Sequence, residues 1–217
     1  MARRISWMGL SVAVASLYAF ASPARADFIE KFDVTVPLQN TDFSTTVTLP
    51  TFQPQGNEKL LGVALELDAK LSSAVTMTFT SLSTITLTPD ALVTVSGPAG
   101  VTLSADPTAT SQQTLSAQTF SATLINTASN SLAESTSPAL LSAFTGGTGS
   151  VGLTFSAKGG LRFDNQGGNG GYDVLTKAGG TVTVFYRVAP EPSSVVLLGL
   201  GGMGAGVLRR FRRRPAT

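Results

Sequence analysis

The segment Val75-Thr-Met-Thr-Phe-Thr80 alternates large apolar residues with threonine, one for one. Successive side chains of a β-strand point to opposite faces, so this alternation predicts a strand with one face packed and the other in water. The same period of two recurs in eight further segments, at residues 32–36, 43–49, 61–67, 85–88, 92–95, 120–124, 151–155 and 182–188.

Together these segments predict an all-β domain at residues 27–188, an antiparallel β-sandwich of about nine strands. Proline, glycine, asparagine and aspartate separate the segments, as is typical of turns. No part of this region shows a sustained helical period, and only residues 132–144 have room for one helical turn.

The 217 residues include no cysteine and no histidine. Disulfides, metal sites built from thiolate or imidazole, and Ser-His-Asp or Cys-His catalysis are therefore excluded. We expect no cofactor and no metal site. The length suits one ordinary domain with short flanking segments.

Residues 1–26 have the parts of a secretory signal peptide, with two arginines near the start, an apolar run and a small-x-small cleavage site. Ala24 and Ala26 form that cleavage site. Signal peptidase would then leave Asp27 as the new N-terminus. An uncleaved membrane anchor is the alternative.

Residues 189–217 form a second targeting segment. The triplet Pro190-Glu191-Pro192 precedes an uncharged apolar span at residues 195–208. As a helix this span would be about 21 Å long, against ~30 Å for a hydrocarbon core, so it would need bilayer thinning or snorkelling arginines. Five arginines follow it, and they are expected to stay in the cytoplasm: Arg209, Arg210, Arg212, Arg213 and Arg214.

The order of these three parts resembles the PEP-CTERM sorting signal of Gram-negative bacteria. The resemblance implies an exported precursor, anchored in the cytoplasmic membrane, whose tail an exosortase recognises and removes. Organisms with this signal make extracellular polysaccharide, so we expect the mature protein in the cell envelope, on the outer surface or in the matrix. A permanent anchor is the alternative.

The basic residues are concentrated in the two targeting segments. Residues 27–188 contain seven lysines and arginines against twelve aspartates and glutamates, a net charge of −5. The body is acidic, and nucleic acid is not an expected partner.

The body also resembles the choice-of-anchor E domain. This resemblance implies an ectodomain that occurs with different C-terminal anchors and has no known activity. It rests on residues 37–50, on Phe52 with residues 61–63 following, on 147–153 and on 181–186.

Few residues of the body suggest chemistry. Glu66 and Asp68 are two apart on one predicted strand, so they share a face, and paired carboxylates can hydrolyse glycosides. A solvated outer face is the simpler interpretation, because Leu65 and Leu67 occupy the opposite side. Residues 164–173 hold oxygen ligands and glycines that a calcium loop would need, although a glycine-rich hairpin tip is favoured.

Two functions are compatible with the sequence. The first is a non-enzymatic surface or matrix protein whose Thr- and Ser-rich sheet faces meet extracellular polysaccharide. The second is a secreted carbohydrate-active enzyme that uses carboxylates. Sugar sites commonly stack rings on aromatic side chains, and the body has no tryptophan and only Tyr172 and Tyr186 as tyrosines, which weakens the enzyme more. We expect no catalytic residue.

Overall fold

The computed structural model describes residues 27–55, 58–147 and 149–190. The chain divides into two compact units. One consists of Ile29–Gln53 and Leu60–Arg187, and it contains the core and the candidate site. The other consists of Met1–Phe28, Pro54–Lys59 and Val188–Thr217.

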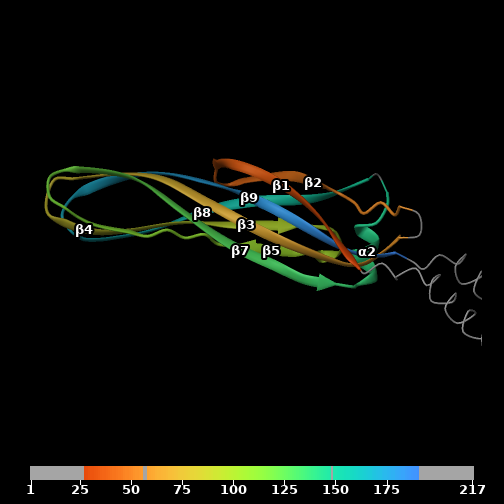
Figure 1. The fold of residues 1–217 in the computed structure, drawn as a ribbon. Coiled ribbons are helices and arrows are strands. Elements are labelled where there is room, and N and C mark those ends of the chain that lie inside the picture. Colours follow the sequence, from red (N-terminus) through yellow and green to blue (C-terminus); the bar gives the residue numbers. More distant parts are fainter. Residues whose placement is uncertain (1–26, 56–57, 148, 191–217) are drawn as a thin grey trace, which may run out of the picture. The chain divides into compact units, whose positions relative to one another are not determined.

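In the described residues nine strands form two sheets, and the sequence-based prediction of an all-β protein with about nine strands in antiparallel sheets is confirmed. The four-stranded sheet has the order β1-β9-β3-β7, and the five-stranded sheet has the order β2-β8-β4-β5, with β6 also paired to β4 (Figure 1). The strands are β1 (Phe28–Asn40), β2 (Phe43–Pro50), β3 (Glu58–Phe79), β4 (Ser83–Ser96), β5 (Thr102–Ala105), β6 (Ser111–Leu115), β7 (Thr119–Ser135), β8 (Ser150–Gly167) and β9 (Gly170–Pro190).

Individual strands differ from the expectation although their number agrees. The segments 61–67 and 75–80 belong to one strand, β3, because the inward phase runs unbroken from Val63 to Phe79. The polar residue in that run, Ser73, is fully buried, and its hydroxyl donates to Thr176 Oγ1 at 3.1 Å. Ser73 interrupts the apolar pattern of the sequence, but it can be buried within the strand because its hydroxyl is hydrogen-bonded.

The segments 85–88 and 92–95 are likewise one strand, β4, which passes through Pro89. The Pro89 carbonyl accepts a hydrogen bond from Ala109 N, on the edge of β4 that faces away from β8. The proline nitrogen faces the same edge, and it lies in the gap between the segment of β4 that pairs with β6 and the segment that pairs with β5. A missing donor at that position removes no ladder bond to β8. The short strands β5 and β6 were not predicted, whereas the helical turn is present as α2 (Pro138–Ala143).

The two sheets enclose the core between their inward faces. One cluster joins Val75 and Met77 of β3 to Ile85 and Leu87 of β4, all of them buried. A second group is aromatic: the rings of Phe32, Phe52 and Phe144 lie 5.9 to 6.3 Å from the ring of Tyr186.

One open flank of the sandwich is closed by asparagines of β7. Asn130 Nδ2 donates to the Ser104 carbonyl of β5 at 2.7 Å, and Asn126 Nδ2 donates to the Thr108 carbonyl. Each asparagine Oδ1 accepts the backbone N–H of the residue that follows it. These amides replace the strand pairing that would otherwise satisfy the edge.

Candidate functional site

Glu66 and Asp68 lie on the outward face of β3, as the alternation predicts. Leu65, just before Glu66, and Leu67, between the two acidic residues, are buried, whereas both carboxylates are partly exposed. Their strand is central in the four-stranded sheet, so residues of the neighbouring strands surround them on the same face.

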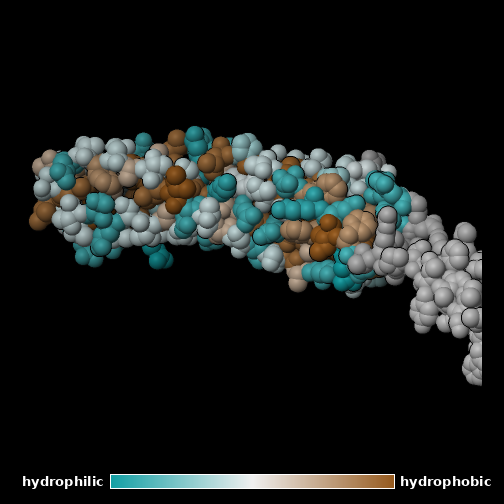
Figure 2. All heavy atoms as spheres, viewed as in Figure 1, coloured by the Kyte–Doolittle hydropathy of each residue, from teal (hydrophilic) through white to brown (hydrophobic). Residues whose placement is uncertain are grey.

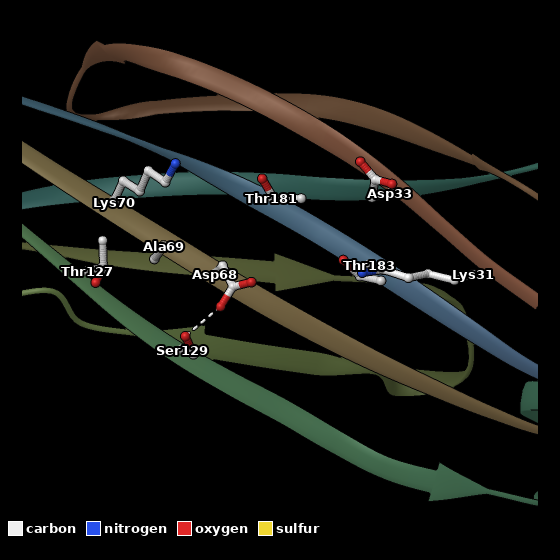
Figure 3. Close-up of a pocket in the computed structure, with 9 residues that line it drawn as sticks. All are labelled: Lys31, Asp33, Asp68, Ala69, Lys70, Thr127, Ser129, Thr181 and Thr183. Carbon is white, nitrogen blue, oxygen red and sulfur yellow. Dashed lines mark hydrogen bonds between the residues drawn. The ribbon is translucent and has the colours of Figure 1, made fainter.

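A depression of about 410 Å³ lies on this outer face. All four strands of the sheet contribute to it, as Figure 3 shows, with Asp68 but not Glu66 in its wall. Its volume is in the range of small-molecule sites, and all but one of its lining residues are charged or carry a hydroxyl. The lining residues are Lys31, Asp33, Asp68, Ala69, Lys70, Thr127, Ser129, Thr181 and Thr183.

Hydrogen bonds and a ring contact hold several of these side chains in place. Ser129 Oγ of β7 donates to Asp68 Oδ1 of β3 at 2.5 Å (Figure 3). At the rim, the hydroxyls of Thr35 and Thr181 are 3.1 Å apart. The ammonium group of Lys31 lies 5.6 Å from the centre of the Phe185 ring, close enough for a cation–π contact.

The depression contains charged groups of both signs that do not form ion pairs with one another. Two lysines, Lys31 and Lys70, and two aspartates, Asp33 and Asp68, line it. Within the described part of the chain, no ion pair joins any two of these four side chains. Donors and acceptors thus remain available to a ligand, along with threonine hydroxyls that can do either.

The other sequence-predicted residues do not join this site. Asp164 lies on β8 and Asp173 on β9, and the turn between these strands is only residues 168–169. The described residues contain no group of three or more Asp, Glu, His or Cys side chains that could hold a metal ion.

The residues of the two targeting segments lie almost wholly outside the described residues. Asp27 is exposed just before β1, and Pro190 is the last residue of β9. Ala24, Ala26, Glu191, Pro192, the span 195–208 and the five arginines are not among the described residues. Where the structure is described, no helix is long and apolar enough to cross a membrane.

Sequence reasoning identified one residue of the depression, Asp68, and missed the rest. Alternation alone places Asp33 on the outward face of its strand. It also places Thr181 and Thr183 on the outward face of the last strand. Bringing these faces together needs the strand order β1-β9-β3-β7, which joins the first strand to the last. No local signal encodes that order.

Comparison with known proteins identifies the tail. Residues 188–214 match the PEP-CTERM protein-sorting motif. The motif implies an exported protein with a membrane-anchored precursor, processed by an exosortase in Gram-negative bacteria. The sequence-based assignment of the sorting tail is thereby confirmed, whereas no curated protein matches the chain.

Two solved structures show a weak likeness. One is the structure of the infectious bursal disease virus Gx strain, with 11% identity and a TM-score of 0.21, covering 75% of this chain and 38% of the viral chain. The other is that of the Gt strain, with 11% identity and a TM-score of 0.13, covering 78% and 43%. This chain therefore spans less than half the length of either viral chain.

Proposed function

We propose that the protein is a non-enzymatic component of the cell envelope or extracellular matrix, with an ectodomain of the choice-of-anchor E type. After export and removal of its sorting tail, it binds extracellular polysaccharide through the depression of the β1-β9-β3-β7 sheet. The observation that carries this proposal is the polar lining of that depression, with ammonium, carboxylate and hydroxyl groups on four adjacent strands.

The chemistry of the lining favours a neutral polysaccharide. Sugar hydroxyls both donate and accept, so they match a surface where the exposed side chains of Lys70, Asp33 and Thr127 donate, accept and do either. A polyanion would be repelled by a body whose net charge is −5. The absence of tryptophan from residues 27–188 makes hydrogen bonding, rather than ring stacking, the main contribution.

Binding measurements test this proposal. The mature protein is titrated by calorimetry with neutral polysaccharide from its host and, separately, with a uronate-rich polymer. We expect the neutral polymer to bind more tightly, and the pair Asp68→Ala with Lys70→Ala to weaken its binding about tenfold, the effect of about 1.4 kcal/mol.

The matched control is Thr94→Val with Lys158→Ala, on the outward face of the other sheet. This control should bind as the wild type does. Equal affinity of the depression variant and the wild type would disprove the assignment of the site, and tighter binding of the uronate polymer would disprove the choice of a neutral ligand.

The enzyme alternative rests on Glu66 and Asp68. They are successive outward residues of one strand and lie on the same face, whereas glycoside hydrolysis places its two carboxyl groups on opposite sides of the scissile bond. We therefore expect no release of reducing ends from host polysaccharide. Release that disappears in the double variant Glu66→Gln with Asp68→Asn would replace the proposed function by the enzyme.

A further inference from the structure

One edge of β8 lacks a neighbouring strand over half its length. β4 pairs with β8 from Thr154 to Gly167, but β2 pairs with it only from Ser150 to Ala157. In the described part of the chain, no strand pairs with the other edge of β8 beyond that point. The resulting free edge, residues 159–167, is visible in Figure 1 where β8 continues past β2.

Both ends of the free edge are defined. Gly159 N donates to Asp42 Oδ1 at 3.3 Å, so the edge is capped where β2 begins. Gly167 has a φ of 111°, which ends the strand at the turn to β9.

The backbone groups along this edge are suited to pairing. Gly149 accepts from Thr51 N and Gly159 donates to Asp42, so odd-numbered residues of β8 direct their backbone toward the β2 side. Leu161, Phe163 and Asn165 therefore present N–H and C=O groups along the free edge, because backbone direction alternates along a strand.

We propose that the free edge of β8 pairs antiparallel with the same edge of a second copy of this chain. The nine residues 159–167 have their midpoint at Phe163, so a two-fold axis at Phe163 uses the whole edge. The pairing then places Arg162 of each copy opposite Asp164 of the other. About six backbone hydrogen bonds form, at Phe163 and between Leu161 and Asn165.

The charges select this register. Arg162 and Asp164 are both exposed on the outward face, and neither forms an ion pair within the described residues. Charges on edge strands commonly prevent pairing. Here an axis centred at 162 would put arginine against arginine, and one centred at 164 would put aspartate against aspartate. Of these three axes, only the one at Phe163 pairs opposite charges.

Apolar side chains line the same flank. Tyr172 of β9 stacks on Phe163 with ring centres 4.2 Å apart, yet it remains 45% exposed, and Leu161 is 39% exposed. Figure 2 shows hydrophobic residues gathered on the viewed face toward the part that lies away from α2. A second copy at the β8 edge would cover Leu161 and Phe163 of both chains.

Charge reversal tests the proposal on the full chain in mild detergent, by co-purification of two differently tagged copies and by sedimentation. We expect wild-type dimers, and about tenfold or weaker self-association for Arg162→Asp and for Asp164→Arg, because each puts like charges opposite one another. The double reversal, Arg162→Asp with Asp164→Arg, should restore dimers. The two single variants mixed together should also associate.

The matched control is Lys158→Asp, a charge reversal on the same strand and face but outside the free edge, next to Ala157, the last residue that pairs with β2. It should leave the dimer intact. Because the chain has no cysteine, Phe163→Cys gives a second test: only the proposed axis places residue 163 opposite itself, and oxidation should link two chains there. A monomeric wild type, or dimers unaffected by either single reversal, would overturn the proposal.

Discussion

Tyr186 shows how one side chain connects distant parts of the chain. It is fully buried, and its hydroxyl donates to the Pro50 carbonyl at the end of β2 at 2.7 Å. Its ring contacts Phe52 and Phe144, so β9, the loop after β2 and the residue that follows α2 meet at one position. Burial, together with the nearby charge of Glu30, raises the pKa of Tyr186 above its ordinary value.

Tyr186→Phe should lower the free energy of unfolding by about 1 to 2 kcal/mol, because the Pro50 carbonyl loses its donor while the ring contacts remain. The raised pKa means that the wild type loses stability as the pH rises above about 10, the value of an unfolded tyrosine. The variant should lose less over that range. Urea unfolding at several pH values measures both effects.

The control for this change is Tyr172→Phe, since Tyr172 is 45% exposed and no hydrogen bond of its hydroxyl is found in the structure. We expect a change within about 0.5 kcal/mol. A Tyr186→Phe protein as stable as the wild type would contradict the role of the buried hydrogen bond.

At the scale of elements, the glycine pair of β9 sets how closely the strands of the first sheet approach. A Cβ atom at Gly180 would lie 2.5 Å from the Asp68 carbonyl oxygen of β3. A Cβ atom at Gly179 would lie 2.7 Å from the Val36 carbonyl oxygen of β1. Both contacts are with backbone, which cannot move aside as a flexible side chain can, so this part of β9 needs glycine.

Gly180→Ala should lower the free energy of unfolding by about 1 to 3 kcal/mol, the usual cost of overpacking. Gly171→Ala is the matched control on the same strand, because nothing lies within 4 Å of its Cβ position. Urea unfolding of the two variants compares them directly. Equal stabilities would mean that the close approach of β3 and β9 does not constrain the strand.

At the scale of the whole molecule, charge is divided between the body and the tail. Residues 27–188 have a net charge of −5, whereas the sorting tail contains five arginines within residues 209–214. The match to the sorting motif covers residues 188–214, so it overlaps the last three residues of β9, which ends at Pro190. Removal of the residues after Pro190 would leave all nine strands with their buried residues.

Intact-mass measurement of the protein extracted from its host tests whether the tail is removed. We expect a mass without residues 209–214, as the sorting motif implies, and without residues 1–26, as the predicted signal peptide implies. A mass that includes the arginines would instead support the permanent anchor.

The same preparation should show a β-type circular dichroism spectrum that does not change with reductant, because the chain has no thiol.

The sequence by itself determined the features that are written locally. The alternation of apolar and polar residues predicts strands and their faces, because side-chain direction depends only on a residue's position within its own strand. Glu66 and Asp68 were therefore placed on the outward face correctly. The sorting motif is also written locally, as a run of neighbouring residues, so it was found from the sequence alone.

Only the tertiary structure decided what depends on neighbours. Residues 61–67 and 75–80 are joined in β3 by its pairing with β7, with Ser73 hydrogen-bonded to Thr176, and the short strands β5 and β6 exist by pairing with β4. The depression needs β1 beside β9, and the free edge of β8 needs β2 to begin at Phe43, opposite Ala157. These are contacts between residues far apart in the chain, and strand order and strand ends are set by packing rather than by local pattern.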